Sequence, residues 1–324
     1  MTFQKTLAAV CAAAVLAGPA LAETTLRFAH PTPEADIQHQ MAEFFAETLA
    51  ERTDGELDVQ IFPGGQLGSD AQAIDGARSG TIDITIAGLN NFTGLIPEAA
   101  AFTLPFMFPT RETAYKVLDS EVGQDVGADL EEFGLILLGY PENGFRNMTN
   151  NTGPIRVPAD VEGLQMRVNN SQALSDMFSA LGANPTQLDV NELYTSLETG
   201  VVTAQDHPIP ITLSFRFYEV QDYLSLTRHA YSPLGWVMNK AKFDSLSPEV
   251  QATLMEVAAE SVAFQRNLAI EGEEEMLATL SEHLAINDDV DGAAFQEAVR
   301  PAWDGFIDEH GDTLINAILT ESAK

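Results

Sequence analysis

The most constraining feature of the chain is one long segment with helical periodicity, which begins at Ser247 and runs to about residue 284. Serine at the N-cap followed by Pro248 at the first helical position favours a helix start at this point. A continuous helix here would have roughly 37 residues and a length of about 55 Å. That length exceeds the diameter of one lobe, and sustained heptads are missing, so we expect a strut across two lobes that Gly272 can bend. Its apolar positions are Val250, Leu254, Val257, Met276, Leu280 and Leu284.

The remainder of the chain alternates between strand-like and helix-like segments, which is typical of an α/β fold. A second set of such segments begins near residue 145, and no low-complexity linker separates the two sets. We therefore predict two lobes joined by crossing strands, an arrangement that suits a hinge. The pattern predicts strands at 25–29, 57–62, 82–87, 135–138, 164–168, 223–227 and 235–238, and helices that include 34–52, 69–79 and 110–133.

The beginning of the chain has the features of a secretory signal peptide. Lys5 precedes a short apolar run from Leu7 to Ala17, Gly18-Pro19 breaks the run, and Ala20-Leu21-Ala22 matches an A-x-A cleavage site. The run is too short to span a bilayer. We expect cleavage after Ala22 and a periplasmic mature protein; a buried N-terminal helix is the alternative.

These boundaries predict three parts of the chain. Residues 1–22 are expected to form the signal peptide. Lobe I is expected to hold residues 23–146 together with about 233–272, and lobe II residues 147–232 together with about 273–324.

The only cysteine of the chain lies inside this apolar run. Cys11 follows Val10, where a lipoprotein site requires a small residue, so we expect a free protein and not a lipid-anchored one. The mature chain then contains no cysteine, which excludes disulfides, zinc–thiolate sites and cysteine nucleophiles. Its stability must come from a hydrophobic core, which 45% hydrophobic composition can supply.

The net charge of −32 argues against nucleic acids and anionic lipid surfaces as partners. It also repels small anions at long range. A site for an anion must therefore draw its attraction from local cations, and the chain has only 16 lysines and arginines.

The motifs of enzymes and metal sites are missing. There is no Gly-x-Ser-x-Gly, no Walker-type loop, no dinucleotide fingerprint and no histidine pair at the i, i+4 spacing of a helical metal site. The segment that starts at Asn287 imitates a calcium loop, but its twelfth position is Ala298 where a glutamate is required. We expect no cofactor, no metal and no enzymatic activity. The alternative is a cleft enzyme with Asp206 and His207 as an acid–base pair.

Two arginines are candidates for binding an anion. Arg167 ends a short predicted strand, and strand ends that face a crevice bind ligands in open α/β sheets. Its guanidinium can donate two hydrogen bonds to a carboxylate. Arg146 lies near the predicted crossover between the lobes. A structural ion pair is the alternative role for each of them.

Several short segments, in this order and spacing, carry a family resemblance. The chain resembles the solute-binding proteins of TRAP (tripartite ATP-independent periplasmic) transporters, in particular the dicarboxylate-binding DctP-like family, along nearly the whole mature chain. The segments are Phe62–Gly68, Pro97–Phe102, Leu104–Phe106, Gly163–Val168, Leu181–Thr186, Asn191–Leu197, Thr199–Val202 and Phe217–Gln221.

The resemblance implies a two-lobed periplasmic binding protein fold, with two mixed sheets flanked by helices, hinge strands and a long helix across both lobes. It implies that Arg167 pairs with the ligand carboxylate and that Arg146 is a second cation. A motif that normally ends in Asn-Pro follows the arginine by about 40 positions in this family. Here His207-Pro208 stands in that place. A protonated His207 would be a third cation, since histidine titrates near pH 6.5; the alternative is that it only orients Arg167 or packs the hinge.

Other polar and aromatic residues are candidates by position. Asn90 and Asn91 follow the third predicted strand, and His30 follows the first. Trp236 and Tyr231 flank the return crossover, where they could form an aromatic wall. A role in the core is the alternative for these five residues.

Two departures from the resemblance concern the size of the ligand. Val190 stands where sugar-acid binders of the family place an aromatic residue, and Gly88 leaves no side chain where some relatives have an acid. Both departures indicate a site less suited to a large amino-sugar acid.

We expect a monomeric protein that captures a small organic anion, a carboxylate or a sulfonate, and delivers it to TRAP membrane permease subunits. A binding partner in a sensory system is the alternative that the sequence leaves open.

Overall fold

The computed structural model describes residues 24–324. The expected signal peptide, its cleavage site and Cys11 lie outside the described residues. The strands form two mixed sheets that share β9 (Tyr223–Asn239). Lobe I contains β1 (Thr24–Ala29), β2 (Leu57–Phe62), β3 (Ile84–Gly88) and β4 (Leu135–Gly139); lobe II contains β5 (Glu142–Asn150), β6 (Gln165–Val168), β7 (Asn184–Gln187), β8 (Ala204–His207) and β10 (Ala285–Asn287).

The strand order is β2-β1-β3-β9-β5-β8-β6-β7, and β4 and β10 also pair with β9. The carboxyl-terminal part of β9 pairs with β3 and β4, and its amino-terminal part pairs with β5 and β10. The crossing strands therefore connect the lobes, as predicted, and the two-lobed α/β fold is confirmed.

Strand β9 differs from its prediction as two separate strands, 223–227 and 235–238. Ser232 and Pro233 look like a turn in the sequence, but both pair with the first residues of β5, where the register shifts. From His229 to Asn239 every residue is buried. The segment is therefore covered on both faces of the sheet. Its pairing with β5 continues past Pro233, because the shift in register forms a bulge that accommodates the proline.

The helices are α1 (Ile37–Arg52), α2 (Asp70–Ser79), α3 (Arg111–Asp119), α4 (Glu121–Ala128), α5 (Gln172–Ala180), α6 (Val190–Glu198), α7 (Ile209–Ser214), α8 (Lys240–Asp244), α9 (Pro248–Ser281), α10 (Gly292–Ala298), α11 (Arg300–His310) and α12 (Thr313–Ser322). The prediction of one continuous helix over 110–133 is wrong, because the segment forms α3, α4 and a 3₁₀ turn. Ser120 is extended, and its hydroxyl accepts a hydrogen bond from the backbone N–H of Val122 at the start of α4. A 3₁₀ turn over Asp129–Phe133 follows α4.

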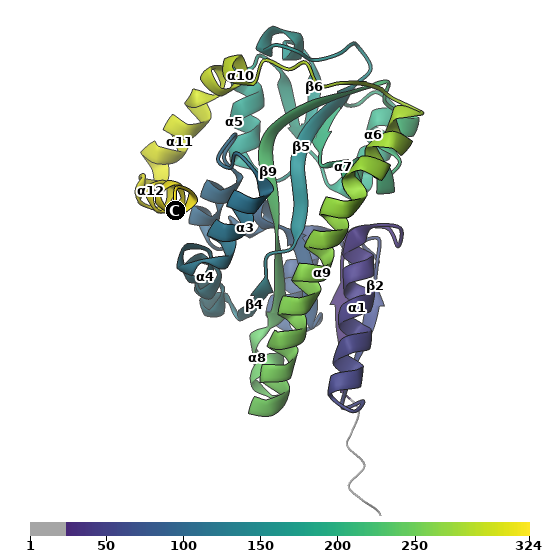
Figure 1. The fold of residues 1–324 in the computed structure, drawn as a ribbon, viewed down its shortest axis with the longest axis vertical. Coiled ribbons are helices and arrows are strands. Elements are labelled where there is room, and N and C mark those ends of the chain that lie inside the picture. Colours follow the sequence, from purple (N-terminus) through teal and green to yellow (C-terminus); the bar gives the residue numbers. More distant parts are fainter. Residues whose placement is uncertain (1–23) are drawn as a thin grey trace, which may run out of the picture.

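Helix α9 is the predicted strut, with 34 residues and a length of about 51 Å. Its first half, with Leu254 and Val257, packs into a lobe I cluster that contains Phe45. Its end, with Leu280, packs against Leu224 of lobe II. Figure 1 shows α9 running along the molecule from α8 to α7. The helix therefore ties both lobes together.

Two features of the structure bear on the predicted lobe boundaries. The boundary at residue 146 falls within β5, which pairs with strands of lobe II from residue 147 onward and with β9 along its length. At the other end, α12 contacts α3 and α4, and Ile315 and Ile318 are buried in a lobe I core cluster. The end of the chain, shown in yellow beside α3 and α4 in Figure 1, thus returns to lobe I.

Candidate ligand-binding site

A cavity lies between the lobes where the ends of β6 and β8 face α1, α2 and the turn after β3. It is lined by both candidate arginines and by His207, and its apolar wall comes from lobe II and β9. The polar lining residues are Thr32, Gln38, Asp70, Asn90, Asn91, Asn143, Arg146, Arg167, Asn169 and His207, and the larger apolar ones are Val190, Ile211, Phe215 and Leu234.

Arg167 contributes a buried cation to this cavity. It is 2% exposed, and its Nε and Nη2 donate to the carbonyl oxygen of Leu188 at 3.0 and 2.7 Å. Among the described residues, no carboxylate oxygen lies within 4.0 Å of its side-chain nitrogens. Burial, followed by the charge of Arg146, lowers the pKa of Arg167 to about 10. Arg167 is therefore a buried cation without a paired anion.

His207 is held in one tautomer by a directional hydrogen-bond chain. Thr149 Oγ1 accepts a hydrogen bond from Gln205 Nε2 at 2.8 Å, so Gln205 Oε1 faces His207 and accepts a hydrogen bond from its Nδ1–H. His207 Nε2 then accepts from Arg167 Nη1 at 3.0 Å. Burial and the two arginines hold the pKa of His207 well below its usual range. In this arrangement Nε2 of His207 is occupied as an acceptor from Arg167, so the geometry favours the role of orienting Arg167 over that of a third cation.

Arg146 lies in the same cavity but has an anion of its own. Its Nε donates to Asp206 Oδ2 at 2.6 Å and its Nη2 to Asp206 Oδ1 at 3.0 Å. His229 Nε2 also donates to Asp206 Oδ2, at 3.1 Å. Burial alone would raise the pKa of Asp206, but Arg146 and the bond from His229 hold this pKa well below its usual range. Arg146 is therefore neutralised within the protein.

The same contacts exclude the acid–base pair considered for a cleft enzyme. Asp206 and His207 are neighbours in β8, so their side chains point to opposite faces of the sheet. Asp206 is bonded to Arg146 and His229, whereas His207 is bonded to Gln205 and Arg167.

Five buried polar atoms around the cavity have no hydrogen-bond partner. Leaving a buried polar group unpaired costs about 1–3 kcal/mol, so such groups are normally completed by ordered water or by a ligand. Four are acceptor oxygens and one is a donor nitrogen, and they come from both lobes. They are Gln38 Oε1, Asp70 Oδ1, Asn143 Oδ1, Asn169 Oδ1 and Asn90 Nδ2.

The asparagines predicted after the third strand do line the cavity, and His30 lies behind it. Asn91 Nδ2 donates to Asp70 Oδ2 at 3.0 Å. His30 is bonded to Thr32 and to His39 Nδ1, and burial together with His39 lowers its pKa to about 3. His30 therefore supports the loop that carries Thr32 and does not line the cavity itself.

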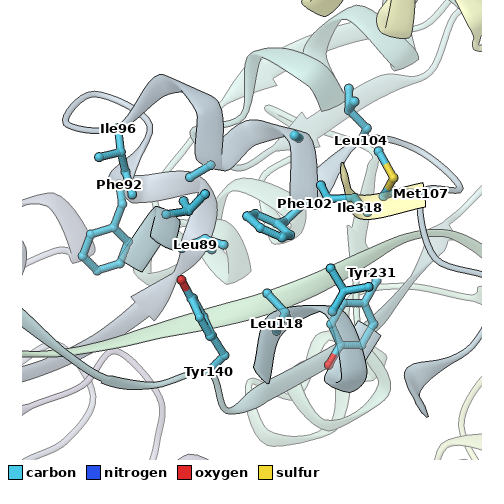
Figure 2. Packing of buried hydrophobic residues seen from close by; sticks show 14 of the residues in the cluster. Leu89, Phe92, Ile96, Phe102, Leu104, Met107, Leu118, Tyr140, Tyr231 and Ile318 are labelled. Atoms are coloured by element: carbon cyan, nitrogen blue, oxygen red, sulfur yellow. The ribbon is translucent and has the colours of Figure 1, made fainter. Parts of the chain in front are cut away.

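The two aromatic candidates are placed elsewhere. Trp236 is fully buried in lobe I, stacked on Phe28 and edge-on to Phe45. Tyr231 lies in the other lobe I core cluster, and Figure 2 shows it near Leu118 in that packing. Neither lines the cavity, because β9 turns these side chains into the cores on its two sides. The expected aromatic wall is replaced by Phe215, from the turn after α7.

Five polar lining residues were not predicted from the sequence: Thr32, Gln38, Asp70, Asn143 and Asn169. Asp70 is the first residue of α2, whose predicted start at Ser69 is confirmed by a capping box between Ser69 and Gln72. In the sequence it therefore looks like an ordinary acidic residue of a first helical turn. Asn169 follows β6 directly, and its place at the strand end beside Arg167 was a signal that could have found it.

One hydrogen bond joins the lobes beside the cavity. Ser214, the last residue of α7 in lobe II, donates through Oγ to Asp36 Oδ2 of lobe I at 2.7 Å. Asp36 is buried, and its Oδ1 accepts from the backbone N–H of Gln38 at the start of α1. The bond therefore links lobe II to the helix that carries a lining residue.

Within residues 24–324, no group of three or more His, Cys, Asp or Glu side chains could hold a metal ion. In the same part of the chain, no helix combines the length and the apolar character that a membrane span requires.

Comparisons with known proteins agree with this geometry. Residues 28–310 match the DctP family, described as bacterial extracellular solute-binding protein, family 7. The 2,3-diketo-L-gulonate-binding periplasmic protein YiaO of Escherichia coli K12 is 43% identical over 302 residues, which are 92% of each chain. Two solved structures have a TM-score of 0.89 to this chain.

One is a TRAP periplasmic solute-binding protein from Polaromonas sp. JS666 bound to D-erythronate, 33% identical, with 91% of this chain and 98% of that one covered. The other is the sugar acid binding protein DctPAm from Advenella mimigardefordensis with galactonate, 34% identical, with 93% and 98% covered. The chain belongs to the DctP family of TRAP solute-binding proteins and is a binding protein for small organic acids, not an enzyme.

Proposed function

We propose that this protein captures a hydroxylated monocarboxylate between its lobes and delivers it to the membrane permease of a TRAP transporter. The observation that carries the proposal is Arg167, a buried cation that faces the cavity without a protein carboxylate beside it. A buried charge costs free energy unless it is paired. A ligand carboxylate would pair with it, in a water-excluded site where the attraction is strong.

The unpaired polar atoms support the hydroxylated character of the ligand. Acceptor oxygens of Gln38, Asp70, Asn143 and Asn169 require donors, and hydroxyl groups of a ligand can supply them. Asn90 Nδ2 can donate to a hydroxyl or keto oxygen. The acids named for the three relatives described above belong to this class, because 2,3-diketo-L-gulonate, D-erythronate and galactonate are monocarboxylates with hydroxyl or keto groups.

Burial of the site supports capture by closure of the lobes. Arg146 and Arg167 are each 2% exposed, so an anion reaches them only when the lobes separate. The shared strand β9 and helix α9 provide the connection about which they can move. We further propose that the chain is exported, is cleaved after Ala22 and acts as a monomer in the periplasm.

Isothermal titration of the mature protein tests the proposal. We expect binding of D-erythronate, galactonate or 2,3-diketo-L-gulonate, and loss of at least 30-fold in affinity in Arg167→Ala, because truncating one partner of a buried charge pair costs about 2–5 kcal/mol. Gln165→Ala is the matched control, since Gln165 is exposed on the same strand. Unchanged affinity in folded Arg167→Ala would contradict the proposal.

A further inference from the structure

We propose that Asp70 is a specificity residue, which restricts this site to singly charged hydroxy acids and excludes dicarboxylates of the same length. The inference rests on the proposed function, because it assumes that a ligand carboxylate pairs with Arg167. The new element is the carboxylate of Asp70, which we propose limits the negative charge that a ligand can carry.

Asp70 brings to the cavity wall a carboxylate with one oxygen that has no protein partner. Asp70 begins α2 in lobe I and lines the cavity together with Arg167 and Asn91. Its Oδ2 is occupied by the amide of Asn91 at 3.0 Å. Its Oδ1 is shielded from solvent and has no hydrogen-bond partner. A ligand hydroxyl can donate to Oδ1, whereas a ligand carboxylate cannot.

The charges that line the cavity lead to the same conclusion. Arg146 is committed to the carboxylate of Asp206 by two hydrogen bonds, so its charge is neutralised before a ligand arrives. That leaves one uncommitted cation, Arg167, and one uncommitted carboxylate, Asp70. A monocarboxylate matches Arg167 and leaves Asp70 free to accept a hydroxyl. A dicarboxylate would bring a second negative charge that no uncommitted cation in the cavity matches, close to Asp70.

The protonation of Asp70 is sensitive to its surroundings. Burial and the charge of Asp189 raise its pKa to about 6, while Arg167 and the bond from Asn91 oppose the rise. At pH 7.5 Asp70 is therefore ionised and repels a second carboxylate. A carboxyl group in a cleft whose pKa is raised by burial and a neighbouring charge is a candidate functional group.

Competition between two four-carbon acids tests the inference at pH 7.5. D-erythronate has one carboxylate and succinate has two, so their charges differ at equal carbon number. We expect the wild-type protein to bind D-erythronate at least 100-fold more tightly than succinate by isothermal titration. In Asp70→Asn, which keeps an acceptor oxygen but removes the charge, this ratio should fall at least tenfold. Asp75→Asn is the matched control, because Asp75 is exposed on the same helix, and its ratio should stay at the wild-type value.

A second variant, Asp70→Ser, removes the charge with a different side chain and should narrow the ratio in the same direction. A ratio that stays at the wild-type value in both folded variants would overturn the role of Asp70. Equal affinity of the wild-type protein for both acids would overturn it as well, although anion capture by Arg167 would stand. If the wild-type protein bound no organic acid, the proposed function itself would fail.

Discussion

Arg146 and Arg167 line the same cavity and are each 2% exposed, yet only Arg146 is paired with a protein carboxylate. Arg146 is held by Asp206, which also accepts a hydrogen bond from His229. Arg167 is held by a carbonyl oxygen and by neutral His207. The first arrangement is complete without a ligand, whereas the second orients a cation and leaves its charge unpaired.

The comparison teaches that burial alone does not identify a ligand-binding arginine. What distinguishes the two is the nature of the partners, a carboxylate for Arg146 and uncharged acceptors for Arg167. It also explains how a chain with a net charge of −32 can bind an anion. Under the proposed function, the attraction comes from one local cation, Arg167, which lies buried in the cavity.

The largest expected effect concerns stability. Arg146→Met leaves Asp206 buried with only His229 as a partner, and breaking a buried ion pair in this way costs about 3–5 kcal/mol. Urea unfolding without ligand should detect a decrease of that size. Arg156→Met is the control, because the exposed pair of Arg156 with Asp289 should contribute less than about 1 kcal/mol. Equal, small losses of stability in Arg146→Met and Arg156→Met would contradict the claim that Asp206 holds Arg146 in a buried ion pair.

The cost of the ionised Asp70 carboxylate can be tested through the dependence of stability on pH. Its pKa is raised to about 6 from the ordinary value of 3.8, so ionised Asp70 destabilises the folded protein as pH rises from about 4 through 6. Asp70→Asn should therefore be more stable than the wild type by roughly 1–3 kcal/mol at pH 7.5, and the gain should disappear toward pH 4. Denaturant unfolding across this range measures the difference; a gain that is constant with pH would contradict the assignment.

The role of His207 predicts a smaller effect on affinity. Asparagine can also donate one hydrogen bond and accept one, so His207→Asn should weaken binding by about tenfold or less. Because His207 is neutral in the folded protein, the variant and the wild type should have the same dependence of affinity on pH between 5.5 and 7.5. Titrations at several pH values check this. If the affinity of the wild-type protein rose at low pH and that of His207→Asn did not, His207 would act as a third cation.

The bond between the lobes predicts the smallest effect. Ser214→Ala removes the hydrogen bond to Asp36, which is worth about 1 kcal/mol, and should weaken ligand binding two- to fivefold if the bond belongs to the closed form. Ser179→Ala is the control, since the hydroxyl of Ser179 bonds only within α5. Identical affinities of the two variants would show that the bond does not contribute to closure.

Local signals made much of the fold predictable. The N-cap and the apolar spacing of α9 predicted both its start and its span across the lobes, because these features act within a few residues. The continuity of β9 was not predictable, since Pro233 looks like a break unless its pairing with β5 is known. The same distant pairing decides where Tyr231 and Trp236 lie: a strand covered on both faces has no polar alternation to show which side chains face a cavity.

The sequence indicated which arginines line the cavity, but not which side chains contact them. Arg167 and His207 were found from the residues and the family resemblance, and the structure brings them into contact. Asp206 neutralises Arg146 from 60 positions away, and Asp70 and Arg167 line one cavity although they come from different lobes. Which charge is committed and which is free depends on these long-range contacts, so one sequence could not assign it.

The central claim is that Arg167, and not Arg146, pairs with the ligand carboxylate. A crystal structure of the complex with D-erythronate tests it most directly. We expect both carboxylate oxygens within about 3 Å of the Arg167 guanidinium, with the bonds from Arg146 to Asp206 retained. A carboxylate bound to Arg146, with Asp206 displaced, would contradict the account.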